Sequence, residues 1–87
     1  MITMTKAAGD YLTALLQRAH ASQDTAIRIV LEDDVLAPAL DTERPGDETL
    51  DYHGRKVLLL DAEVCEYLAD STLDVQPTDQ GPRLILH

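Results

Sequence analysis

The hydrophobic positions follow a helical period at the start of the chain and a strand period afterwards. Behind Thr5, apolar residues recur every three or four positions to about residue 21, which predicts an amphipathic helix with Thr5 as its N-cap. Over residues 26–31 the side chains alternate between an apolar and a more polar face, which predicts a strand with one exposed face. Residues 35–40 are again apolar, but Pro38 lacks a backbone N–H and indicates an edge strand or a bulge.

The middle of the chain predicts a hairpin that contains the most apolar strand. Residues 48–52 and 55–60 flank His53 and Gly54, and a glycine in such a turn can take a positive φ. Residues 57–60 read Val-Leu-Leu-Leu without alternation, which is typical of a strand that is covered on both faces. We therefore expect this segment at the centre of the core.

A short helix and two further strands are predicted for the rest of the chain. Asp61 is suited to cap a helix that ends near residue 70. Residues 73–76 and 83–87 predict strands, and the proline- and glycine-containing residues 77–82 predict the turn between them. The order of helix, two strands, hairpin, short helix and two strands predicts one α+β domain over residues 1–87, mainly β, with mixed or mainly antiparallel strands.

Composition limits the size and the chemistry of the core. The 87 residues include three tyrosines but no phenylalanine or tryptophan, so the core must be aliphatic. A domain of this length buries only about 60% or slightly more of the surface that its unfolded chain exposes. Because so small a core gains from a partner, we expect a homo-oligomer.

The charge balance argues against several classes of partner. Sixteen acidic and seven basic residues give a formal net charge of −9. Nucleic acids and anionic membrane surfaces both require lysine and arginine, whereas a basic protein partner or a cation remains compatible with this charge. No apolar run approaches the roughly 20 residues that span a bilayer, and the N-terminus lacks the pattern of a signal peptide. We therefore expect a cytoplasmic protein.

Three adjacent carboxylates form the first candidate site. Glu32, Asp33 and Asp34 offer the oxygen ligands that hard cations such as Mg²⁺, Ca²⁺ or Fe²⁺ prefer. Successive residues of an extended chain point to opposite faces, however, so three neighbours rarely converge on one ion. A solvated acidic turn is the favoured interpretation of this segment.

Cys65 is the single cysteine, so an internal disulfide and an internal site with several cysteines are excluded. The thiol could serve in redox chemistry or bridge a cluster between two protomers. Its helical neighbours Leu68 and Ala69 instead indicate a face that packs into the core, and free cysteine is among the most buried residue types. We favour the buried interpretation.

The three histidines show no spacing typical of metal ligands. His20 is explained by the end of the first helix, His53 by its turn and His87 by its terminal position. Asp51 and His53 could form a surface ion pair, which would contribute little to stability. No nucleophile motif, phosphate-binding glycine loop or zinc signature occurs, so the chain is predicted not to be an enzyme.

Short segments spread along the chain resemble the HesB/IscA family of A-type iron–sulfur cluster carriers. They occur in the family's order and at about its spacing, and together they span nearly the whole chain. The segments are Ile2-Thr3-Met4-Thr5 with Ala7-Ala8, Leu12 to Leu16, Arg28-Ile29, Gly46-Asp47-Glu48, Gly54, Lys56-Val57-Leu58, Asp61, Tyr67-Leu68, Ser71-Thr72-Leu73-Asp74-Val75 and Gly81. The resemblance implies a HesB-like domain.

The resemblance also shows which residues are missing. Carriers of this family hold a cluster or iron through three cysteines, one in a glycine-rich loop after the first strand and two in a Cys-Gly-Cys near the C-terminus. Here the first position falls within residues 32–35, where there is no cysteine, and we expect the tail with the second pair to be absent, since residues 66–87 contain no cysteine. Since these clusters need thiolate ligands, we expect no cluster cofactor and a degenerate family member that acts through protein contacts. The alternative is a small iron-binding protein that uses Glu32, Asp33 and Asp34.

Overall fold

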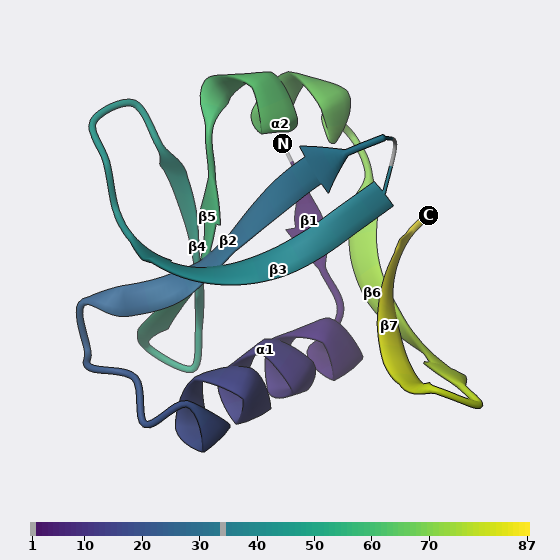
Figure 1. Ribbon diagram of the computed structural model, residues 1–87. Coiled ribbons are helices and arrows are strands. Elements are labelled where there is room, and N and C mark those ends of the chain that lie inside the picture. Colours follow the sequence, from purple (N-terminus) through teal and green to yellow (C-terminus); the bar gives the residue numbers. More distant parts are fainter. Residues whose placement is uncertain (1, 34) are drawn as a thin grey trace.

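The computed structural model describes residues 2–33 and 35–87 as seven strands and two helices (Figure 1). The predicted elements are all present, and a two-residue strand precedes the first helix. The elements are β1 (Thr3–Met4), α1 (Lys6–Arg18), β2 (Thr25–Glu32), β3 (Val35–Thr42), β4 (Glu48–Tyr52), β5 (Arg55–Leu60), α2 (Ala62–Tyr67), β6 (Thr72–Thr78) and β7 (Gly81–Leu86).

The strands form two mixed sheets. One sheet has the order β3-β2-β5-β4, and the other has the order β1-β6-β7. Strand β2 runs parallel to β5 and β1 runs parallel to β6, whereas the remaining pairs are antiparallel. The predicted α+β class with mixed strands is confirmed, and β3 is an edge strand, as Pro38 indicated.

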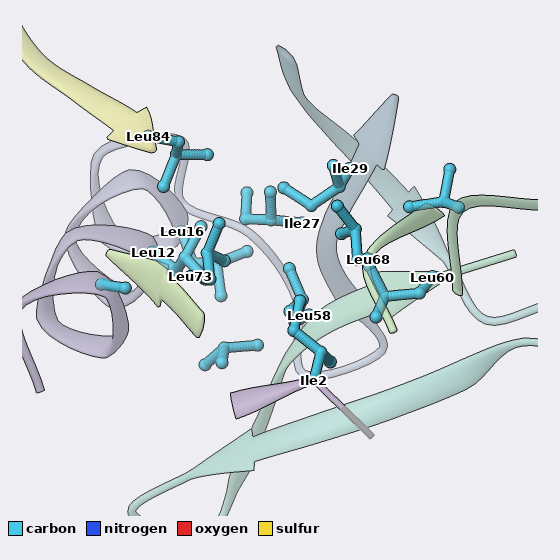
Figure 2. Close-up of a cluster of buried hydrophobic side chains, with 13 residues drawn as sticks. Ile2, Leu12, Leu16, Ile27, Ile29, Leu58, Leu60, Leu68, Leu73 and Leu84 are labelled. Atoms are coloured by element: carbon cyan, nitrogen blue, oxygen red, sulfur yellow. The ribbon is translucent and has the colours of Figure 1, made fainter. Parts of the chain in front are cut away.

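The core is aliphatic and draws on almost every element. Helix α1 packs against β2, β5 and β6, and α2 lies over β2 and β5 at the opposite end of the molecule (Figure 1). Residues 57–60 of β5 are fully buried, as their unbroken apolar run predicted. Figure 2 shows the side chains that meet between the two sheets and α1: Ile2, Leu12, Leu16, Ile27, Ile29, Leu58, Leu60, Leu68, Leu73 and Leu84.

Both helices begin where the sequence predicted, but α1 ends earlier. The Thr5 hydroxyl accepts a hydrogen bond from the Ala8 N–H at 3.1 Å, and the Asp61 carboxylate accepts one from the Val64 N–H at 2.8 Å. Helix α1 stops at Arg18, and His20 lies beyond its end with a φ of 51°. The Ala21 N–H reaches the Leu16 carbonyl and the His20 N–H reaches that of Gln17, the hydrogen-bond pattern of a Schellman motif.

Gly9 provides space for an aromatic ring on the surface of α1. A Cβ atom at Gly9 would lie 2.4 Å from Cδ1 of Tyr52, which is far inside van der Waals contact. The Tyr52 hydroxyl donates to Asp10 at 2.8 Å, and the ring stacks on His53 with centroids 4.1 Å apart. The glycine inside α1 is therefore explained by the close approach of β4.

Arg28 differs from its prediction. It falls on the face of β2 that was expected to be exposed, yet only 7% of its surface is accessible. Its guanidinium donates to Asp41 at 2.7 Å and to both carboxylate oxygens of Asp47 at 3.0 and 2.6 Å. The loop between β3 and β4 is thereby held over β2, and the pairing lowers the pKa of Asp47 to about 2.

The predicted turn over residues 77–82 is much shorter in the structure. Strand β6 continues to Thr78 and β7 begins at Gly81, so Pro77 and Pro82 lie opposite each other within the ladder. Thr72 and His87 exchange both of their backbone hydrogen bonds, and alternation from that pair places the two prolines at a non-hydrogen-bonded position. No ladder bond is lost there, which explains why prolines are compatible with both strands.

Candidate functional site

The hairpin of β2 and β3 occupies the position where the family resemblance places the first cluster ligand. The two strands pair as far as Glu32 and Val35, so the connection is a tight turn and not a glycine-rich loop. Glu32 and Asp33 are exposed, and Asp33 has a φ of 50°. Asp34, the third carboxylate of the candidate cation site, lies outside the described residues.

Over residues 2–33 and 35–87, the structure contains no group of three or more histidine, cysteine, aspartate or glutamate residues that could hold a metal ion. Glu32 is the last residue of β2, and Asp33 begins the turn. Glu32 and Asp33 are both exposed at the tip of this hairpin.

Strand β7 brings the end of the chain to the same region. The C-terminal segment contacts the start of β3 (Figure 1). Between them lies a hollow of about 370 Å³, which the end of α2 also borders. We call it the β3–β7 hollow, and its lining residues are Val35, Leu36, Tyr67, Gln76, Arg83, Leu84, Ile85 and Leu86. The lining offers no thiolate, imidazole or carboxylate, so it does not fit an iron–sulfur cluster.

Cys65 lies on α2 and is not among the residues that line this hollow. It is partly buried against the core, whereas its neighbour Val64 is 4% exposed and Ala69 is exposed. The expected burial of Cys65 is therefore only partly met, and that of Ala69 is wrong. The thiol donates to Glu48 Oε2 at 3.1 Å, and desolvation together with this carboxylate raises the pKa of Cys65 to about 11. A raised pKa keeps the thiol protonated at neutral pH, which makes it a weaker nucleophile.

The structure places the three histidines apart. His20 lies directly beyond the end of α1, and His53 occupies the β4–β5 turn with a φ of 52°. Among the described residues no ion pair joins Asp51 to His53, and the His53 ring stacks on Tyr52. His87 Nε2 lies 2.8 Å from Asp74 Oδ2.

Asp74 ties the two ends of the chain together. Its Oδ1 accepts hydrogen bonds from the Thr5 hydroxyl at 2.7 Å and from the Val75 N–H at 2.8 Å, while Oδ2 faces His87. These contacts, the Thr5 bond above all, lower the pKa of Asp74 to about 2. The N-cap of α1 is thereby linked to β6 and to the last residue of the chain.

This low pKa predicts a loss of stability in acid. The pKa of Asp74 is lower in the folded than in the unfolded protein. The ionised carboxylate therefore adds its full contribution to the free energy of unfolding above about pH 4, and this contribution disappears as the pH falls toward 2. At pH 5 the wild type should therefore unfold at a higher urea concentration than Asp74→Asn. The difference between the two urea midpoints should shrink between pH 4 and pH 2. Asp79→Asn, in the β6–β7 turn, controls for the loss of one carboxylate. A difference between wild type and Asp74→Asn that stays constant over this range would contradict the assignment.

Comparisons with known proteins identify the fold. No family model matches the chain, and no curated protein matches it. Solved structures, however, match it over nearly its whole length, and they define a HesB/IscA-like fold, as the sequence resemblance predicted.

Three of these structures are informative. SufA of Escherichia coli, involved in the biosynthesis of iron–sulfur clusters, matches with a TM-score of 0.73 and 16% identity over 99% of this chain and 83% of its own. IscA with a [2Fe-2S] cluster matches with a TM-score of 0.68 and 19% identity, over 100% of this chain and 84% of its own. A protein from Aquifex aeolicus matches with a TM-score of 0.77 and 20% identity, over 99% of this chain and 89% of its own. At these identities the likeness shows the fold alone.

The sequence did not reveal the β3–β7 hollow. Its lining comes from β3 and, more than 20 residues further along the chain, from α2, β6 and β7, and no single segment shows it. The signals that could have indicated it are Val35, an apolar residue directly after an acidic turn, and Tyr67, the only aromatic residue in the short helix α2.

Proposed function

We propose that this chain is a HesB/IscA-like protein that carries no iron–sulfur cluster and acts, without catalysis, through contacts with other proteins. The observation that carries the proposal is the β3–β7 hollow. It lies between the β2–β3 hairpin and the C-terminal strand, near which the resemblance assigns the cluster ligands, and all its lining residues except Gln76 and Arg83 have largely apolar side chains, although polar and apolar surface contribute about equally to it. Such a lining suits a protein side chain better than iron.

The state of the single thiol supports the same function. Cys65 is hydrogen-bonded to Glu48 and lies on α2, and one cysteine in each protomer is fewer than a cluster requires. The neighbours of known role, SufA and IscA, are named for iron–sulfur clusters. A related role in cluster assembly, as a cytoplasmic binding module without its own cofactor, is consistent with both observations.

Anaerobic reconstitution with Fe²⁺ and sulfide tests the proposal. We expect no stable cluster absorbance and no stoichiometric iron after desalting, while SufA treated in parallel gains both. Cys65→Ser should behave like the wild type. Glu32→Gln/Asp33→Asn tests the alternative of iron held at the acidic turn, and we expect it to leave the iron content unchanged. Cluster absorbance at stoichiometric occupancy would refute the proposal, and iron that is lost only in the carboxylate variant would favour the alternative.

We also propose that residues 1–87 act as one HesB-like domain that forms homo-oligomers. A second apolar groove of about 360 Å³ lies between the end of α1 and edge strand β3, where Leu40 is 52% exposed. Burial of this groove by a second copy would offset the small size of the core. Sedimentation velocity should show a species larger than the 9.6 kDa protomer, and Leu40→Ser should shift it toward the protomer. A protomer at every concentration would contradict self-association.

A further inference from the structure

The β3–β7 hollow has two large apolar side chains at its mouth. Val35 is 49% exposed and Tyr67 is 50% exposed, although both border the hollow. Half-exposed aromatic and branched residues around a concave surface are typical of protein contact sites. The volume of about 370 Å³ is near the lower end of the range for binding pockets, so it suits one large side chain and not a whole domain.

The rim of the hollow near β3 and α2 is acidic. Glu32 pairs with Val35 across the hairpin and Asp33 follows it, while Glu66 precedes Tyr67. Glu63 lies four residues before Tyr67, so both occupy one side of α2. All four carboxylates are exposed, and within the described residues none of them has a lysine or arginine partner.

The charge of the hollow is asymmetric. Arg83 lines it from β7, on the same face as Ile85 and nearer to the β6–β7 turn. The unpaired carboxylates lie at the other end, around the hairpin tip and α2. The hollow therefore distinguishes the two ends of whatever occupies it.

We propose that the β3–β7 hollow binds a segment of another protein that inserts one large apolar side chain among Val35, Tyr67 and Ile85. Lysine or arginine residues on one side of that anchor then lie against Glu32, Asp33, Glu63 and Glu66. The proposal rests on the proposed function, since it names the kind of partner that a protein-binding module of this fold would take. Charge complementarity gives such a contact its specificity and a fast association rate.

A second copy of the chain does not fit this surface. Each copy has a formal net charge of −9, and the rim would place unpaired carboxylates against another acidic surface. Like charges brought together at an interface disfavour it by several kcal/mol. The groove between α1 and β3 differs, because Arg18 and not a carboxylate stands among its lining residues.

Selection from a random 12-residue peptide library displayed on phage, with the full chain as bait, tests the proposal. Enriched peptides should carry a net positive charge next to a leucine or an aromatic residue. Synthetic copies of them should shift the amide resonances of Val35, Tyr67 and Ile85 in NMR titrations. Binding should weaken as salt approaches 1 M, where the Debye length is only about 3 Å.

Variants separate the hollow from the rest of the surface. Tyr67→Ser should weaken binding of the selected peptides about tenfold or more, and Glu32→Gln/Glu63→Gln/Glu66→Gln should weaken it and reduce its dependence on salt. Val30→Ser, at an exposed apolar residue outside both grooves, and Asp24→Asn should leave it unchanged.

Two results would overturn the inference: no enrichment of basic peptides, or peptide binding that Tyr67→Ser leaves intact. Neither result bears on the proposal that the chain carries no cluster, because reconstitution measures cluster binding separately. Conversely, a reconstituted cluster would refute the proposed function even if peptides bound in the hollow.

Discussion

Replacing Arg28 with alanine is expected to lower the free energy of unfolding by about 3–5 kcal/mol, the usual cost of removing one partner from a buried ion pair. The side chains of Arg28 and Asp47 are 8% and 3% exposed, so the substitution leaves a carboxylate that is shielded from water and has lost its two strongest donors. Because domains of this size have little stability to lose, much of the population should unfold at 25 °C. Urea denaturation followed by circular dichroism measures the change.

The matched control for Arg28 is an exposed pair. Lys6 forms an ion pair with Asp10 at 3.0 Å, and its side chain is 82% exposed, so Lys6→Ala should change stability little. Arg28→Lys should fail to restore the wild type, because an ammonium group cannot engage Asp47 through two parallel hydrogen bonds. Equal effects of Arg28→Ala and Lys6→Ala would show that the network does not stabilise the loop between β3 and β4.

The second expectation concerns Gly9. Gly9→Ala should destabilise the protein by about 1–2 kcal/mol, because a clash of the Cβ with the Tyr52 ring costs about 1–3 kcal/mol and the better helix propensity of alanine returns only part of it. In a Tyr52→Leu background the clash is relieved, and the same substitution should become neutral or stabilising. Thermal unfolding of the four proteins in this double-mutant cycle measures the coupling. Additive effects of the two substitutions on stability would contradict the conclusion that Gly9 makes room for the Tyr52 ring.

The sequence predicted the elements that local patterns determine. The Thr5 and Asp61 caps, the hairpin at His53 and Gly54, and the buried run in β5 each depend on a few adjacent residues. In all of these cases local chemistry and the final fold agree.

Features that depend on contacts between distant segments were not predicted. The alternation in β2 assigns Arg28 to the solvent, because it contains no information about the loop that closes over this residue through Asp47. In α2, six residues define the phase of the buried face poorly, so Val64 takes the place that Cys65 was expected to fill. Pro77 and Pro82 resemble turn residues until the register of β6 and β7 is known.

The candidate site also has one part that the sequence reveals and one part that only the structure reveals. The presence of a single cysteine, Cys65, is visible in the sequence itself, and it motivated the expectation that no cluster binds. The β3–β7 hollow requires β3, α2 and β7 to meet, and only the tertiary structure shows that they do. The sequence thus led to the expectation about cluster binding, and the structure adds the surface on which the proposed function rests.

The central claim is that this HesB/IscA-like fold no longer carries a cluster. Its most direct test is the Mössbauer spectrum of the protein produced in cells grown on ⁵⁷Fe and purified without oxygen, with SufA prepared in the same way. We predict no protein-bound iron signal from this chain and a cluster signal from SufA. A quadrupole doublet typical of thiolate-bound iron, at one cluster per oligomer, would contradict the account.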